Sequence, residues 1–152
     1  IKNNQRTNMS KTILLIEDNG DDEMLTIRAL KKNNISNEIV VMRDGQQAME
    51  YLFGGGVDGV KLEDELPQVV LLDLKLPKID GLEILEAIRN NKKTQLLPVV
   101  ILTSSSEDED IVKGYKLGAN SFIRKPVNFN DFVEAVGRLG MYWVLLNENP
   151  NR

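Results

Sequence analysis

Short apolar runs alternate with amphipathic stretches five times along the chain. Four of the runs are rich in Val, Ile and Leu, are bounded by turn residues and are too short for helices. The runs are Thr12–Ile16, Glu38–Met42, Val69–Leu72, Val99–Leu102 and Ser121–Ile123. Because the apolar residues do not alternate with polar ones, the runs predict strands that are covered on both faces, as in a parallel sheet.

The stretches between these runs carry helix start and stop signals. Asp44 and Asp80 stand at predicted N-caps, Ser106 opens a capping box and Asn128 opens the last helix. Gly118 is a predicted helix stop. Consecutive strand–helix units imply right-handed crossovers, and therefore an α/β fold. We predict a flavodoxin-like (βα)5 doubly wound parallel sheet with the strand order 2-1-3-4-5.

Composition narrows the chemistry that is open to this fold. The chain has 152 residues, 41% of them hydrophobic, which suits one domain with a substantial core. It contains no Cys and no His, so any chemistry must use carboxylates, hydroxyls, Lys and Arg. A formal charge of −4 argues against nucleic acid as the main partner. The longest apolar run, Met141–Leu146, is far shorter than the roughly 18 residues that cross a bilayer.

These features predict a soluble, cytoplasmic protein with no membrane partner. We expect a flexible polar lead over residues 1–11, one domain over residues 12–147 and a short polar tail over residues 148–152.

Polar side chains stand where the predicted strands end. Glu17 and Asp18 follow the first strand, Asp73 follows the third, Thr103 the fourth and Lys125 the fifth. In the order 2-1-3-4-5, these ends meet in the crevice where doubly wound sheets bind ligands. Converging carboxylates repel one another unless a cation lies between them, and an all-oxygen donor set suits Mg2+. The sequence therefore predicts a magnesium site at this edge.

The same set is arranged to receive a phosphoryl group. Asp73 would attack phosphorus to give an acyl phosphate. Mg2+ and Lys125 would neutralise the equatorial oxygens, and Thr103 would donate a hydrogen bond to one of them. Taken singly, each residue also has a structural reading, such as a strand-end acceptor, a β-former or an exposed turn lysine.

Four motifs in order resemble the receiver domain of two-component response regulators, over about residues 12–140. They are Ile16–Asp18 (IED), Leu71–Gly81 (LLDLKLPKIDG), Leu102–Ser105 (LTSS) and Gly118–Pro126 (GANSFIRKP). The resemblance implies that Asp73 is the phosphoacceptor, which takes phosphate from a phosphohistidine on a sensor histidine kinase.

The resemblance also assigns the metal ligands. Asp18 and Asp73 match the direct ligands, the backbone carbonyl of Lys75 joins them, and Glu17 acts through water.

Further family roles fall beyond the fourth and fifth strands. Thr103 matches the switch hydroxyl, with Ser104 beside it, and Lys125 the phosphate-contacting lysine. Phe122 takes the place of the aromatic switch residue, which is often Tyr, and the Lys125–Pro126 bond is expected to be cis.

Two positions depart from the family pattern. Lys75 and Ser105 each stand two residues beyond a site residue, at the positions that flank the attacking water. Both bear on the rate of dephosphorylation.

The end of the chain bears on output. The loop at residues 54–67 and the ending Leu139–Pro150 resemble single-domain regulators that are paired with bacterial phytochrome-type histidine kinases. In the last helix, Met141, Tyr142 and Leu145 lie opposite a core stripe: Phe129, Phe132, Val133, Val136, Gly140 and Trp143. A helix that is apolar on both sides favours a homodimer or partner contact. We expect output through such a contact, because no effector domain follows.

Three alternatives stay open at this level. A haloacid-dehalogenase-type phosphatase would need a second Asp at the position of Lys75. A flavin- or nucleotide-binding module would need a phosphate-cradling loop after the first strand, where Glu17 and Asp18 repel phosphate. A pseudo-receiver would keep the fold as an interaction module that is not phosphorylated.

Overall fold

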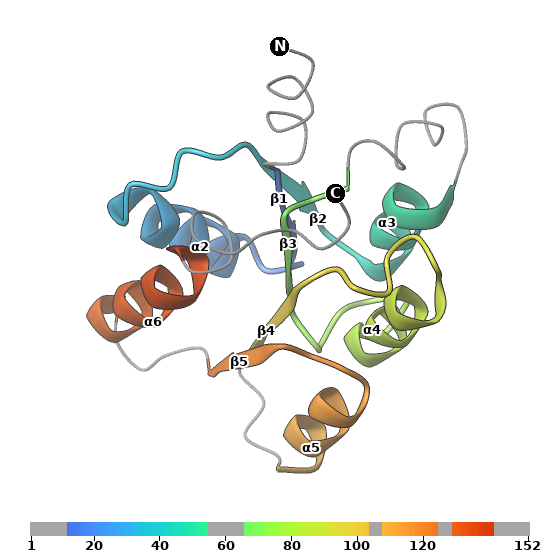
Figure 1. The fold of residues 1–152 in the computed structure, drawn as a ribbon. Helices are drawn as coiled ribbons and strands as arrows, with labels where there is room; N and C mark the ends of the chain where they lie inside the picture. The colour runs from blue at the N-terminus through green and yellow to red at the C-terminus, as the bar shows by residue number, and fades with distance from the viewer. Residues whose placement is uncertain (1–11, 55–65, 104–107, 125–128, 142–152) are drawn as a thin grey trace.

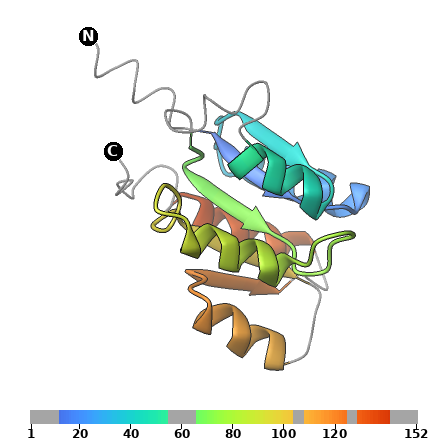
Figure 2. The ribbon, with the colours of Figure 1, turned by 90° about the vertical axis from the view of Figure 1, so that its right-hand side faces the viewer.

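The computed structural model describes residues 12–54, 66–103, 108–124 and 129–141. Its centre is a five-stranded parallel sheet in the order β2-β1-β3-β4-β5, which confirms the predicted topology (Figures 1 and 2). The strands are β1 (Ile13–Ile16), β2 (Ile39–Met42), β3 (Val69–Leu72), β4 (Val99–Thr103) and β5 (Ser121–Arg124). The last two are one residue longer than predicted, because Thr103 still pairs with Arg124.

Helices cover both faces of the sheet. Figure 1 shows α2 and α6 on one face and α3, α4 and α5 on the other. Their bounds are α2 (Gly20–Lys32), α3 (Gly45–Met49), α4 (Gly81–Asn90), α5 (Asp108–Lys116) and α6 (Phe129–Met141), with a π-helical turn η1 (Glu50–Gly54) after α3. Within the described ranges, no helix combines the length and the apolar character of a membrane span.

The two faces bury separate apolar cores. Along β1, Ile13 and Leu15 join the core under α2 and α6, whereas Leu14 and Ile16 join the core under α3 and α4. All residues of β1 and β3 are buried, as the unbroken apolar runs predicted. The edge strand β2 is only partly buried.

Capping residues set the helix ends at the sequence positions that predicted them. The Asp44 side chain accepts a hydrogen bond from the Gln47 N–H at 2.8 Å, and Glu83 accepts one from the Asp80 N–H at 3.2 Å. Gly118, with φ of 99°, terminates α5. Asn19 caps α2, a role that the sequence analysis did not assign. Ser106 and Asn128 lie outside the described residues.

One side-chain amide joins α2 to α6. The Asn33 Nδ2 donates to the Ala29 carbonyl oxygen at 2.7 Å and to the Val133 carbonyl oxygen at 3.1 Å. Gly137 permits this approach, because a Cβ there would overlap Asn33. Of the predicted core stripe, Phe132 is buried, and the Phe129 ring lies 5.1 Å from the Arg28 guanidinium carbon.

A second clamp closes the opposite face. The half-buried Arg89 donates to the Gly118 carbonyl oxygen at 2.7 and 3.0 Å, to that of Leu97 at 2.8 Å and to Asn120 Oδ1 at 3.1 Å. Burial lowers the pKa of this guanidinium from its ordinary value. One side chain of α4 thereby fixes the starts of β4 and β5 and the end of α5.

We expect Arg89→Met to lower the free energy of unfolding by about 2 kcal/mol, because several carbonyl oxygens lose a charged donor. Urea titration would measure this loss. Arg138→Met is the control: Arg138 is exposed and pairs with Glu134 only at 3.8 Å, so the change should stay within about 0.5 kcal/mol. Equal losses in the two variants would contradict the clamp.

Candidate functional site

Three carboxylates gather at the carboxyl edge of the sheet. Glu17 and Asp18 follow β1 directly, and Asp73 follows the neighbouring strand β3. The ladders continue into the site, since the Glu17 N–H donates to the Met42 carbonyl oxygen and the Asp73 N–H to that of Ile16, both at 3.0 Å. One carboxylate oxygen from each acid lies within 4.8 Å of the others. The predicted convergence of these three side chains is confirmed.

The acids of the cluster differ in exposure. Glu17 is fully buried and Asp73 is 5% exposed, whereas Asp18 faces solvent. Backbone donors orient the buried pair: the Asn19 N–H lies 3.3 Å from Glu17 Oε2, and the Lys75 N–H lies 3.2 Å from Asp73 Oδ1. Ionised carboxylates this close repel one another, a bound cation would relieve the repulsion, and a hard cation such as Mg2+ prefers an all-oxygen set of this kind. The donor set therefore fits Mg2+.

The structure places the other predicted site residues in part. Thr103 ends β4, so its backbone lies at the same edge of the sheet as the acids, and Lys75 is exposed on the loop after β3. Met141 is the last residue of α6. The remaining predicted positions lie outside the described residues: Ser104, Ser105, Lys125, Pro126, Tyr142 and Leu145.

Phe122 lies in β5 beneath α5. Its ring is partly buried in the core that α3 and α4 cover, and its centroid is 5.0 Å from that of Tyr115 at an interplanar angle of 45°. Gly114 leaves room for it, because a Cβ there would come within 2.5 Å of the Phe122 ring. The Phe122 side chain thus connects β5 to α5.

An ion pair between α3 and the loop after β3 could not be predicted from the sequence. Asp44, recognised only as a helix cap, also lies 3.5 Å from Lys78 Nζ on the loop between β3 and α4. The hydrogen bond from the Gln47 N–H, helped by Lys78, lowers the pKa of Asp44. The Asp-Gly pair at the end of β2 marks the cap, but nothing in the sequence pairs it with a lysine 34 residues later.

The fold and its acidic edge define a receiver domain. Residues 13–137 match the family model of the response regulator receiver domain, and the chain belongs to that family. It is accordingly a response regulator of phosphorylation-based signalling. Membership of this family disfavours two of the alternatives, the haloacid-dehalogenase-type phosphatase and the flavin- or nucleotide-binding module.

Two relatives match over most of their length. The chain is 39% identical over 141 residues to the probable methanogenesis regulatory protein FilR2 of Methanothrix harundinacea, covering 91% of this chain and 86% of the relative. It is 36% identical over 138 residues to response regulator Rcp1 of Synechocystis sp., covering 91% and 92%.

Solved structures agree with the predicted resemblance to phytochrome response regulators. The phosphorylated cyanobacterial phytochrome response regulator RcpA superposes with a TM-score of 0.83 at 34% identity, covering 92% of this chain and 98% of that one. The Mn2+-bound form of Rcp1 gives 0.80 at 35% identity, covering 92% and 99%. The bacteriophytochrome response regulator RtBRR gives 0.72 at 48% identity, covering 92% and 84%.

We expect Mg2+ to stabilise the wild-type protein and Asp18→Asn to remove most of that effect. At a cation concentration about 100 times the dissociation constant, the gain is about 2.7 kcal/mol. Thermal unfolding with Mg2+ and with chelator measures it. The matched control is Asp21→Asn, an acid in the first turn of α2 that is not part of the cluster. A wild-type response in Asp18→Asn would contradict the assignment of Asp18.

Proposed function

We propose that this protein is a phosphorylation-dependent switch that accepts a phosphoryl group on Asp73 from a sensor histidine kinase, with Mg2+ as its cofactor. One observation carries the proposal: in a receiver fold, the buried Asp73 directly follows the central strand β3, and one of its carboxylate oxygens lies within 4.8 Å of those of two further acids. A divalent cation in a similar structure, the Mn2+-bound form of Rcp1, supports the choice of cofactor.

The reaction would transfer the phosphoryl group from one nucleophile, the imidazole of the donor histidine, to another, the carboxylate of Asp73. A carboxylate oxygen of Asp73 attacks phosphorus, the P–N bond of the donor phosphohistidine breaks, and the imidazole leaves with the electron pair. The product is an acyl phosphate on Asp73. The Lys75 N–H, 3.2 Å from Asp73 Oδ1, orients the carboxylate for this attack.

The cation lowers the repulsion between the acids and the incoming phosphoryl group when it is bound. The cation would be held directly by Asp18, Asp73 and the backbone carbonyl of Lys75, and through water by Glu17. Because Glu17 is fully buried, its side chain would lie on the side of the cation that faces away from bulk solvent.

In this proposal the site also includes Thr103, Ser104 and Lys125. Lys125 would neutralise phosphoryl oxygens, and Thr103 would move toward the phosphoryl group, drawing Phe122 inward. Phe122 supports a packing readout, because its ring already contacts Tyr115 and lacks a hydroxyl. Lys75 and Ser105 would set the lifetime of the acyl phosphate.

The donor that fits best is a phytochrome-type histidine kinase. Similarity to RcpA and RtBRR, both phytochrome response regulators by name, supports this choice. We take residues 12–147 as the functional unit and a homodimer as its output form, with Met141, Tyr142 and Leu145 at the contact.

We expect the wild-type protein to gain the mass of one phosphoryl group during incubation with acetyl phosphate and Mg2+. Asp73→Asn should gain none, because an amide cannot form the acyl phosphate. Intact mass spectrometry, with a chelator control, makes the comparison, and equal uptake by both proteins would contradict the assignment of Asp73.

Failure of the wild-type protein to take up phosphate has two readings, and beryllofluoride separates them. Binding of this phosphoryl mimic would identify a competent site that is restricted to its cognate kinase. Absence of binding would favour the pseudo-receiver alternative.

We expect sedimentation equilibrium to detect a wild-type dimer that Leu145→Ser weakens, since the sequence pattern predicts apolar side chains on both sides of the last helix, and such a pattern favours a partner contact. Val112→Ser on α5 is the control, because Val112 is also an exposed apolar residue, at 49%. A monomer at high concentration, with and without phosphorylation, would contradict the homodimer. Loss of the dimer in Val112→Ser alone would move the contact to α5.

A further inference from the structure

The loop between the proposed phosphoacceptor and α4, here called the acceptor loop, consists of residues 74–80. Both of its ends are held by short-range hydrogen bonds. The Lys75 N–H lies 3.2 Å from Asp73 Oδ1, and the Gly81 N–H donates to the Leu74 carbonyl oxygen at 3.0 Å. Neither bond reaches the middle of the loop, which needs support from elsewhere in the fold.

The first turn of α3 supplies that support. The Gly45 N–H donates to the Pro77 carbonyl oxygen at 3.2 Å, and the Ile79 N–H turns back to the same oxygen at 2.8 Å. Gly45 has to be glycine for this approach, because a Cβ would overlap the Ile79 carbonyl oxygen and lie 2.9 Å from its carbonyl carbon. Helix and loop are therefore in backbone-to-backbone contact.

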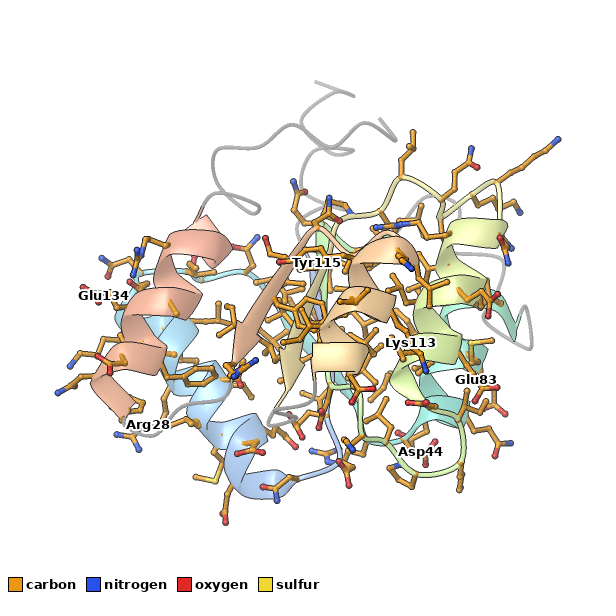
Figure 3. All side chains as sticks on the ribbon, turned by 90° about the horizontal axis from the view of Figure 1, so that it is seen from below. Arg28, Asp44, Glu83, Lys113, Tyr115 and Glu134 are labelled. Atoms are coloured by element: carbon orange, nitrogen blue, oxygen red, sulfur yellow. The ribbon has the colours of Figure 1, made fainter. Side chains whose placement is uncertain are left out.

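An ion pair strengthens the same contact. Lys78 has a φ of 72°, a left-handed conformation that is unfavourable for a residue with a side chain, and its Nζ lies 3.5 Å from Asp44 Oδ2. The other oxygen of Asp44 caps α3. Asp44 thus ties the start of the helix to the strained residue of the loop, and Figure 3 shows it beside the segment that leads into α4.

We propose that Gly45, with Asp44 and Lys78, is a positioning element for the cation site: it holds the acceptor loop in the shape that presents the Lys75 carbonyl beside Asp73. The inference rests on the proposed function, in which that carbonyl is a ligand. None of the three residues touches the cation. Their effect is to remove the freedom that the loop would otherwise lose when the cation binds.

Gly45→Ala tests the steric contact, and Gly20→Ala is its matched control. Each glycine is the first residue of a helix, directly after an N-cap residue at the same edge of the sheet. A Cβ on Gly20 meets nothing within 4 Å. In proteins generally, Gly→Ala leaves folding stability unchanged or raises it where the backbone conformation suits alanine. A general effect of alanine would therefore appear in both variants.

The measurement is the dissociation constant for Mn2+, from the electron paramagnetic resonance signal of free Mn2+, on protein shown to be folded by urea titration. We expect Gly45→Ala to weaken binding at least tenfold and Gly20→Ala to change it less than twofold. Wild-type affinity in a folded Gly45→Ala protein would overturn the positioning role alone. Absence of Mn2+ binding by wild-type protein would overturn the proposed cation site, and the inference with it.

Lys78→Gln keeps the test decisive if Gly45→Ala does not fold. A purely electrostatic influence of Lys78 has the opposite sign to a positioning role, because removal of a positive charge near the acids would tighten Mn2+ binding. We expect about threefold weaker binding in Lys78→Gln and in Asp44→Ser, which keeps a capping oxygen. The double variant should be no weaker than either single one. Tighter binding by Lys78→Gln would overturn the proposal.

Discussion

The parallel pairing of β1 with β3 is the constraint on which the site depends. Ile16 pairs with Leu72, so both strands leave the sheet at the same level, and the next residue of each is a buried acid, Glu17 or Asp73. Because side chains alternate between the faces of a sheet, a slip of one residue would separate these acids and would exchange the side chains that pack in the two cores. The register of β1 against β3 therefore determines both the packing of the two cores and the position of the carboxylate cluster.

Two kinds of support surround that pair of strands. Asn33 and Gly137 hold α2 and α6 together at backbone distance on one face, and Arg89 bridges α4, β4 and the end of α5 on the other. Both clamps use a buried or half-buried polar group with backbone carbonyl oxygens as acceptors, so the charge or amide is satisfied where apolar packing alone would leave it unpaired. Both clamps lie away from the acids. The carboxyl edge of the sheet therefore holds the side chains that repel one another.

The sequence predicted the parts that depend on local pattern. Apolar runs without alternation identified the parallel strands, and residues directly after those runs identified Glu17, Asp18 and Asp73. Contacts between distant segments escaped prediction, because periodicity says nothing about close approach of backbones. Gly45 reads as a turn glycine until Ile79 is placed against it, and Arg89 reads as a surface arginine until Gly118 and Leu97 turn their carbonyl oxygens toward it.

The two faces of the molecule are unequally connected to the site. On the side of α2 and α6, the Asn19 cap touches the acidic edge, but α2 is then locked to α6 through Asn33. On the other side, the acceptor loop contacts α3 through Gly45, and Phe122 packs under α5 beside Tyr115. The contacts of the acceptor loop with α3 and of Phe122 with Tyr115 therefore connect the carboxyl edge to the face of α3, α4 and α5, whereas the Asn33 amide joins α2 to α6. A switch built on this fold would present its altered surface there, with Arg89 holding the far end of α5 as the fixed point.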